Sequence, residues 1–275
     1  MKVSILIPNI FNHPFTYQNK STKLAKGDFV KVPFGSSLVT GVVWDYFEET
    51  NKNFKIRAVE KVLEVPRMKN SMIKFVNWFS LYNLVPLGMS LRLVLFNKTA
   101  VETIASESFE QFKSTDVTKK YSLNLEQKKC LSEISKKMDF NVHVIDGVAG
   151  SGKTLVYFSR VKELIDKGYQ ALIMLPEIGL TSQFQQRFFD FFNFEPAIWH
   201  SNVTKKNKRI IWRGVLENKI KTVIGARSSL FLPFKKLGII IVDEEHDSSY
   251  KQNEGVMYNA RDMAISRASF EKIPI

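Results

Sequence analysis

Eight residues in the middle of the chain have the types and spacing that bind nucleotide phosphates. They are Gly147-Val148-Ala149-Gly150-Ser151-Gly152-Lys153-Thr154, and they meet the GxxxxGK[ST] pattern. The glycines let backbone N–H groups curl around a triphosphate, and Lys153 supplies a mobile charge for its β and γ phosphates. The Thr154 hydroxyl is placed to bind Mg²⁺. The alternative is a glycine-rich turn without a ligand, but the pattern favours a triphosphate-binding loop.

A second candidate site is the acidic segment Asp243-Glu244-Glu245-His246, which follows a continuous apolar run, residues 237–242. Asp243 can hold Mg²⁺ through water, and Glu244 can orient and deprotonate an attacking water. An acidic loop that merely caps the next helix is the alternative. Taken together with residues 147–154, the segment predicts hydrolysis of a nucleoside triphosphate.

The surrounding sequence predicts the elements that position both motifs. Residues 155–167, closed by Gly168, have a helical pattern with a glycine at the C-terminal cap. From residue 123 onward, helical segments alternate with apolar runs, which is typical of a doubly wound parallel sheet. The strands that we expect are residues 142–145, 171–175, 222–224 and 239–242. Ligands of such sheets lie at the carboxyl ends of the strands, where both motifs fall.

The first part of the chain has a different pattern. Short β-like runs separated by proline and glycine are followed by two helical segments. The expected strands are residues 3–7, 29–32, 39–44 and 58–63, and the expected helices are residues 71–84 and 86–96. Residues 97–120 are polar and without periodicity. We therefore predict a small, mainly β domain over residues 1–98, a linker over 99–120, and an α/β P-loop (RecA-like) domain over 121–275.

Composition limits the class of protein. The formal net charge is +13, which favours a polyanionic partner, nucleic acid before membrane, although a lysine-biased genome could produce the same excess. No apolar run approaches membrane-spanning length, and the N-terminus lacks the layout of a signal peptide. The single cysteine, Cys130, excludes an internal disulfide and fits a reducing, cytoplasmic setting.

Longer motifs identify a family. Those in the second half are Leu123-Asn124-Leu125-Glu126-Gln127, residues 176–181, Trp199-His200-Ser201, residues 225–234 and residues 243–252. They resemble the PriA family of superfamily 2 replication-restart DNA helicases, also called primosomal protein N′, and the run from Gly225 to Gln252 is the most selective. In the first half, residues 15–17, 27–35, 40–43 and 78–88 resemble that family's domain for the 3′ end of a nascent strand. The resemblance leaves out only the linker.

The resemblance implies a function: an ATP-driven 3′-to-5′ DNA helicase that uses Mg²⁺, binds forked and single-stranded DNA, and acts with primosome and single-strand-binding proteins at abandoned forks. Gln127 would recognise adenine, and His246 would couple hydrolysis to DNA movement. Phe15, Thr16 and Tyr17 would line the pocket for the DNA 3′ terminus, unless these aromatic rings only pack within the β domain. Arg227, Tyr250 and Lys251 would also contact DNA.

Three departures from the family qualify this expectation. Thr16 stands where relatives commonly have aspartate, and Val256 and Met257 stand where they tend to have tryptophan and arginine. The linker is shorter than a folded domain, so the winged helix of relatives is not expected. The sequence also stops at Ile275, before the second motor lobe with its arginine fingers and zinc-binding cysteines. We expect this chain alone to hydrolyse ATP poorly. The alternatives are a fork-binding protein without helicase activity of its own and, third, an RNA helicase.

Overall fold

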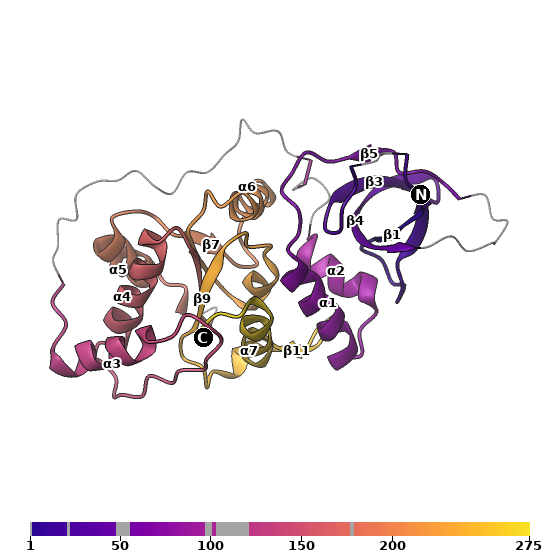
Figure 1. Cartoon of the computed structure of the whole chain (residues 1–275). Helices are drawn as coiled ribbons and strands as arrows, with labels where there is room; N and C mark the ends of the chain where they lie inside the picture. Colours follow the sequence, from indigo (N-terminus) through magenta and orange to yellow (C-terminus); the bar gives the residue numbers. More distant parts are fainter. Residues whose placement is uncertain (1, 21–22, 48–55, 97–100, 103–120, 177–178) are drawn as a thin grey trace.

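The computed structural model describes residues 2–20, 23–47, 56–96, 101–102, 121–176 and 179–275. Two kinds of sheet divide the chain, an antiparallel one at the N-terminus and a parallel one with helices after it, as predicted (Figure 1). The expected linker, residues 99–120, falls almost wholly outside the described residues.

The N-terminal sheet curls into a ring of strands (Figure 1). Its strands are β1 (Lys2–Leu6), β2 (Phe15–Gln18), β3 (Phe29–Phe34), β4 (Ser37–Phe47) and β5 (Lys61–Val62). Neighbours run antiparallel in the order β2-β1-β4-β3-β5. The ring closes because Gln18, at the end of β2, pairs with Ala58, just before β5. Alternate residues of the strands, such as Val3, Ile5 and Val30, fill its interior.

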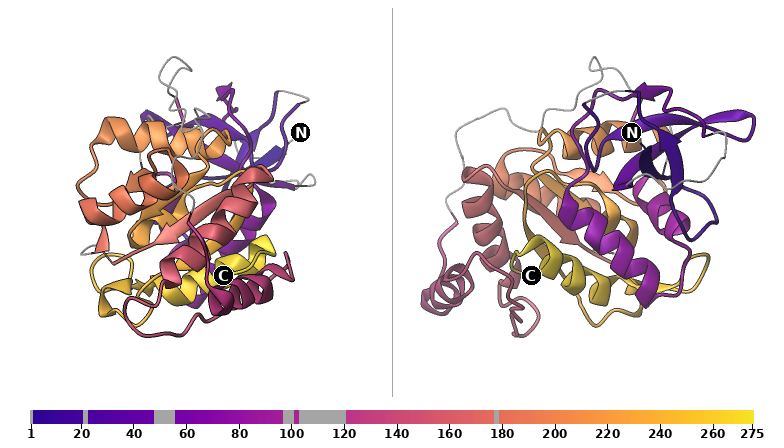
Figure 2. Two further views of the ribbon diagram at one scale, coloured as in Figure 1. Left: turned by 90° about the vertical axis from the view of Figure 1, so that its left-hand side faces the viewer. Right: turned by 45° about the vertical axis from the view of Figure 1, so that its right-hand side comes forward.

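Two helices join the ring to the rest of the molecule: α1 (Asn70–Tyr82) and α2 (Leu87–Val94). Their buried residues belong to one core that also contains outward-facing residues of the ring and residues of the parallel sheet. At the centre, the Trp212 ring lies 5.7 Å from that of Phe29, and its Nε1 donates to the Val94 carbonyl at 2.8 Å. Figure 2 shows α1 beside the last helix, α7 (Ala260–Glu271).

The second sheet contains β6 (Gln170–Met174), β7 (Ala197–Trp199), β8 (Thr222–Gly225) and β9 (Leu237–Val242). All its pairings are parallel, and the order is β7-β8-β6-β9. Along β6, Ala171 and Ile173 pack against α4 (Lys153–Asp166) and α5 (Ser182–Phe192) on one face. Leu172 and Met174 face the opposite core, which includes α6 (Lys205–Leu216) and α7. Both faces are therefore buried, as a parallel sheet requires.

Shorter elements complete the second half. They are α3 (Leu125–Ser135), the 3₁₀ turns η3 (Arg227–Phe231) and η4 (Ser248–Tyr250), and the two-residue strands β10 (Lys251–Gln252) and β11 (Tyr258–Asn259). The side chain of Asn124 accepts from the Gln127 backbone, and the Gln127 side chain accepts from the Asn124 backbone, forming a capping box at the start of α3.

The strand expected over residues 142–145 does not form, so this prediction was wrong. Only Asn141 forms a bridge, with Pro274, and the His143 N–H donates to the Ile275 carbonyl at 2.8 Å. The Ile240 N–H of β9 donates to the Pro274 carbonyl at 3.3 Å, so the last residues lie between β9 and this segment. Among the described residues, no strand runs beside residues 144–146, and the Val144 side chain is 82% exposed. The apolar composition of residues 142–145 predicted a buried strand, but no described neighbouring strand covers residues 144 and 145.

Candidate nucleotide site and DNA-binding domain

The phosphate-binding loop has the backbone that its glycines allow. Gly150 and Gly152 have φ of +81° and +83°, which favours glycine, and Gly152 is the N-cap of α4. No side chain of the described residues accepts a hydrogen bond from the N–H groups at the start of this helix. These groups, together with the helix dipole, give the loop a positive potential. The loop can therefore receive an anion at the start of α4, as the sequence predicted.

Two side chains fix the loop in its present form. The Lys153 ammonium donates to the loop's own carbonyls, Gly147 at 2.5 Å and Val148 at 3.4 Å. The Gln127 amide donates to the Ser151 carbonyl at 2.9 Å, and a Cβ on Gly152 would lie 2.4 Å from its nitrogen. Gln127 thus connects α3 directly to the loop, and its expected contact with adenine stays a prediction.

The acidic segment begins where β9 ends, level with the end of β6. The Asp243 N–H donates to the Met174 carbonyl at 3.0 Å, and Glu244 has φ of +48°, which turns the chain sharply. One Asp243 carboxylate oxygen accepts from the Glu244 N–H at 3.0 Å, and the other accepts from the Tyr157 hydroxyl at 2.7 Å. Asp243 is thereby held at the edge of the sheet that faces the phosphate-binding loop.

Tyr157 connects the two motifs, and the sequence analysis missed it. Its hydroxyl donates to the Asp243 carboxylate at 2.7 Å, and its position on α4 is one turn after Thr154. Burial, and then the negative charge of Asp243, raises the pKa of Tyr157, so the hydroxyl keeps its proton and can donate. The available signal was its position one helical turn after Lys153, on the face of α4 that carries Thr154.

Thr154 and Asp243 suit Mg²⁺. A hydroxyl and a carboxylate are hard oxygen donors, and Mg²⁺ usually takes few protein ligands while keeping waters and substrate phosphates. In the described ranges no group of three or more His, Cys, Asp or Glu residues could hold a metal ion. Thr154 and Asp243 offer the oxygen donors that Mg²⁺ takes, and their role as its ligands stays a prediction.

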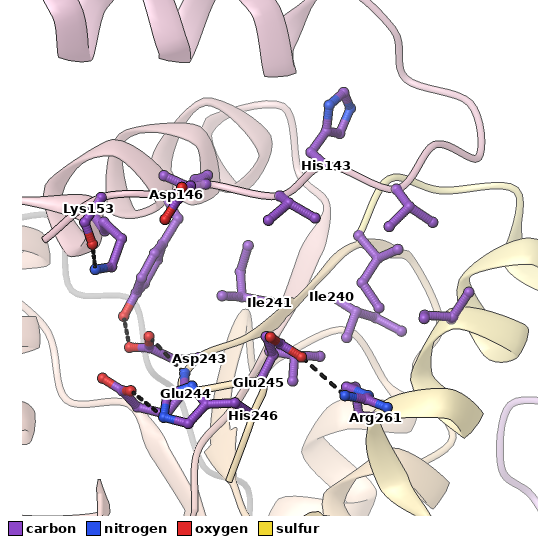
Figure 3. A pocket seen from close by; sticks show the side chains of 18 of the residues that line it. His143, Asp146, Lys153, Ile240, Ile241, Asp243, Glu244, Glu245, His246 and Arg261 are labelled. Carbon is purple, nitrogen blue, oxygen red and sulfur yellow. Dashed lines mark hydrogen bonds and ion pairs between the residues drawn. The ribbon is translucent and has the colours of Figure 1, made fainter.

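A cavity of about 620 Å³ separates the segment before the loop from the end of β9 (Figure 3). Residues 142–147 form one wall and residues 240–246 the other, with Lys153 and Tyr157 at one side. Glu244 and His246 are largely exposed, and their side chains approach to 3.7 Å. On the far side, the Arg261 guanidinium lies 3.1 Å from the Glu245 carboxylate and 3.0 Å from that of Asp262. The structure thus brings Lys153, Asp243, Glu244 and His246 to one cavity.

The residues expected to contact DNA in this half are not all accessible. Tyr250 is 2% exposed, and its hydroxyl donates to the Asp243 carbonyl at 2.6 Å and lies 3.0 Å from that of Met174. Its assignment as a DNA contact is therefore corrected: the ring supports the acidic segment from beneath. Lys251 is exposed, and the Arg227 guanidinium donates to its carbonyl at 3.0 Å.

The three residues expected to line a DNA 3′-end pocket lie on β2, where Phe15 and Tyr17 share the inner face and Thr16 points to the opposite one. Tyr17 is 4% exposed inside the ring of strands, and its hydroxyl donates to the Pro33 carbonyl at 3.1 Å. It is a packing residue, as the alternative interpretation had it. Thr16 points to the exposed face, and Phe15 is half-buried. The period of two along a strand explains the division.

Phe15 instead belongs to an aromatic cluster that the sequence analysis missed, consisting of Phe11, His13, Phe15 and Phe34. The Phe15 ring centroid lies 4.9 Å from that of His13, 5.5 Å from that of Phe11 and 5.2 Å from that of Phe34. Phe11 and His13 precede β2 on an exposed turn. The only signal was the alternation of aromatic residues from 11 to 15.

Comparison with known proteins agrees with this geometry. The profile of the DEAD/DEAH box helicases matches residues 124–272, more than half of the chain. The chain belongs to the DEAD/DEAH box helicase family. In front of this helicase domain, residues 2–96 match the 3′DNA-binding domain of PriA. Helicases of this family use a nucleotide and Mg²⁺, which fits the loop and the oxygen pair described above.

Individual relatives extend the similarity over both halves. The chain is 42% identical to the replication restart protein PriA of Rickettsia felis, over 98% of its own length and 41% of the relative. It is 33% identical to PriA of Helicobacter pylori, over 92% of its length and 38% of the relative. The expected resemblance to PriA is confirmed, and the chain spans about two fifths of the length of these relatives. None of the described helices is long and apolar enough to cross a bilayer.

Proposed function

We propose that the chain is the DNA-binding domain and first motor lobe of an ATP-dependent DNA helicase of replication restart. The proposed division is residues 1–98 for DNA binding, 99–120 as a linker and 121–275 as the motor lobe. The observation that carries the proposal is the hydrogen bond from the Tyr157 hydroxyl, on the helix that starts at the phosphate-binding loop, to the Asp243 carboxylate at 2.7 Å. It supports a single site for the phosphate-binding and acidic motifs, and the residues before the motor lobe match a 3′DNA-binding domain.

The residues of the site divide the work of phosphoryl transfer. Lys153 leaves the Gly147 carbonyl and binds the β and γ phosphates, while the N–H groups at the start of α4 hold the remaining oxygens. Thr154 and Asp243 would hold Mg²⁺, which would neutralise phosphate charge. Glu244 orients the attacking water and takes its proton, and His246 next to it couples the reaction to movement of DNA. Gln127, which donates to the Ser151 carbonyl of the loop, recognises the adenine.

On the DNA side, the aromatic cluster offers rings on which an exposed terminal base can stack, with a gain of about 1 to 3 kcal/mol per base. Thr16, on the opposite face of β2, offers a hydroxyl to the DNA. Arg227 and Lys251 provide positive charge at the motor lobe. The partners are forked and single-stranded DNA, and by similarity to PriA the primosome and single-strand-binding proteins, with 3′-to-5′ unwinding in the cytoplasm.

A second candidate is a fork-binding protein that holds a nucleotide but does not unwind DNA by itself. One observation favours it. Arg261, the one arginine among the described residues that line the nucleotide cavity, is bound by Glu245 and Asp262. Among the described lining residues, no unpaired arginine is left to stabilise charge at the γ phosphate, a contribution that reaches roughly 10³-fold or more in related enzymes.

ATP hydrolysis with and without forked DNA separates the two candidates. The helicase proposal expects DNA-stimulated turnover in the unchanged chain and its loss in Lys153→Ala. Lys205→Ala, which removes an exposed lysine at the start of α6, is the control and should leave turnover intact. Turnover that DNA does not stimulate, or that survives in Lys153→Ala, would contradict the helicase proposal. Nucleotide and fork binding without turnover would support the second candidate.

A further inference from the structure

A second cavity lies at the edge of the parallel sheet opposite the nucleotide site. Its volume is about 370 Å³, more than ten times the ~30 Å³ that one water occupies in the liquid. It opens where β6 and β9 begin, whereas the phosphate-binding loop and Asp243 lie where parallel strands end. Five lysines contribute to its lining: Lys69, Lys167, Lys235, Lys236 and Lys272. Nothing in the nucleotide site accounts for this concentration of positive charge.

The charges around this cavity are poorly balanced. Its one carboxylate, that of Glu271, lies 2.5 Å from the Lys69 ammonium, and the Glu271 side chain is only 1% exposed. Within the described part of the chain, the other four lysines have no carboxylate partner. Burial, and then the positive charge of Lys236, lowers the pKa of the neighbouring Lys221. The cavity thus keeps a surplus of about four positive charges that an anion would relieve.

Of the four lysines without a carboxylate partner among the described residues, two have a structural reason for their positions and two do not. Lys167 and Lys272 are the C-caps of α4 and α7, where a cation interacts favourably with the helix dipole. Lys235 and Lys236 precede β9 and cap no helix. Their backbone is nevertheless fixed, because the Gln170 side chain, which is buried, accepts from the Lys236 N–H at 2.8 Å. The hydrogen-bonded backbone therefore presents two adjacent ammonium groups that are suited to binding an anion.

We infer that this lysine-lined cavity binds the phosphodiester backbone of duplex DNA. The inference rests on the proposed action at DNA forks and assigns a duplex arm of the fork to this edge of the sheet. The lysines come from four segments: the start of α1, the end of α4, the turn before β9 and the end of α7. That spread fits successive phosphates of a polymer better than one small anion. Tyr169 is the only aromatic side chain among the described lining residues, so the cavity contacts backbone and not stacked bases.

Salt dependence of DNA binding tests the inference, because each lysine-phosphate contact adds about 0.9 to the slope of log K against log salt concentration. The experiment uses the full 275-residue chain and a blunt fluorescent duplex in an anisotropy titration. Lys235→Gln with Lys236→Gln should reduce the slope by about 1.8. The matched control is Lys205→Gln with Lys206→Gln, which removes two adjacent exposed lysines elsewhere and should leave the slope nearly unchanged. Both pairs change the net charge equally.

Each outcome decides the matter. An unchanged slope in the Lys235 and Lys236 variant, or an equal reduction in both variants, would overturn the inference, the latter because only net charge would then count. Competition by inorganic pyrophosphate as effective as that by unlabelled duplex would assign the cavity to a small anion and also contradict it. ATP binding, measured in parallel with Lys153→Ala, tests the proposed nucleotide site separately. The four substituted lysines, two in each variant, are exposed, and thermal melting confirms folding of each variant.

Discussion

The phosphate-binding loop and strand β2 each present consecutive residues of a binding motif, but their backbones distribute these residues differently. In the loop, two glycines with positive φ and the start of α4 direct backbone N–H groups toward one point. In β2, the pleat sends Tyr17 into the ring of strands and Thr16 to the exposed face. Neighbouring residues of the loop therefore contribute to one site, whereas neighbouring residues of the strand have different roles.

The largest effect should come from the buried side of β2. Tyr17→Ala should lower the free energy of unfolding by roughly 3 to 5 kcal/mol, because it empties a site inside the ring of strands. Thr16→Ala, on the exposed face, should change it by less than about 0.5 kcal/mol. Urea denaturation of both variants measures the difference. Similar losses in the two would show that the strand does not divide its residues in this way.

The loop can be tested with two glycines of equal φ. Gly152 and Gly168 both have φ of +83°, so alanine at either should cost about 1 to 2 kcal/mol of stability. Only at Gly152 would the new Cβ meet a neighbour, the Gln127 amide nitrogen at 2.4 Å, whereas Gly168 has open space. Gly152→Ala should therefore weaken ATP binding at least ~10-fold, the equivalent of about 1.4 kcal/mol. Gly168→Ala should leave it unchanged in a calorimetric titration, and equal affinities would contradict the account.

A smaller effect is expected at the contact between the two motifs. Tyr157→Phe removes the hydroxyl that donates to Asp243, at a cost of about 1 kcal/mol, and should weaken Mg²⁺-dependent ATP binding roughly fivefold. Tyr258→Phe, at a buried tyrosine that packs against Phe79 and Phe231, is the control and should leave it unaltered. ATP affinity measured over a Mg²⁺ titration gives the comparison. Equal Mg²⁺ dependence in the unchanged chain and both variants would show that Tyr157 has no role in the nucleotide site.

The smallest effect concerns the exposed face of β2. Thr16→Asp introduces a charged acceptor, and hydrogen bonds to charged groups are roughly twice as strong as neutral ones. Binding of forks with a free 3′ hydroxyl should tighten a few-fold, while forks that end in a 3′ phosphate should bind more weakly through repulsion. Fluorescence titrations of both forks check this. Unchanged affinity for the hydroxyl fork would argue against a role for residue 16 at the 3′ end.

Sequence reasoning succeeded where local chemistry dictates the backbone. Residues 147–154 require glycines at fixed positions, and the apolar run before Asp243 is buried as β9. It failed where a distant partner decides. Residues 142–145 look like a buried strand, but in the described part of the chain the backbone bonds at this segment are those of Asn141 and His143, both to Ile275. Tyr250 and Tyr157 could not be assigned either, because burial and contact with Asp243 depend on how β6, β9 and α4 meet.

The bridge between Asn141 and Pro274 also sets an order of events during synthesis on the ribosome. The segment that leads into the phosphate-binding loop emerges about 130 residues before its bonding partners, Pro274 and Ile275. Contacts between such distant positions form late, because the intervening chain must first be ordered. A nascent chain can thus complete the ring of strands long before its nucleotide site gains this support. Competence to bind ATP should consequently arise only after residues 274 and 275 have been made, later than the DNA-binding domain takes shape.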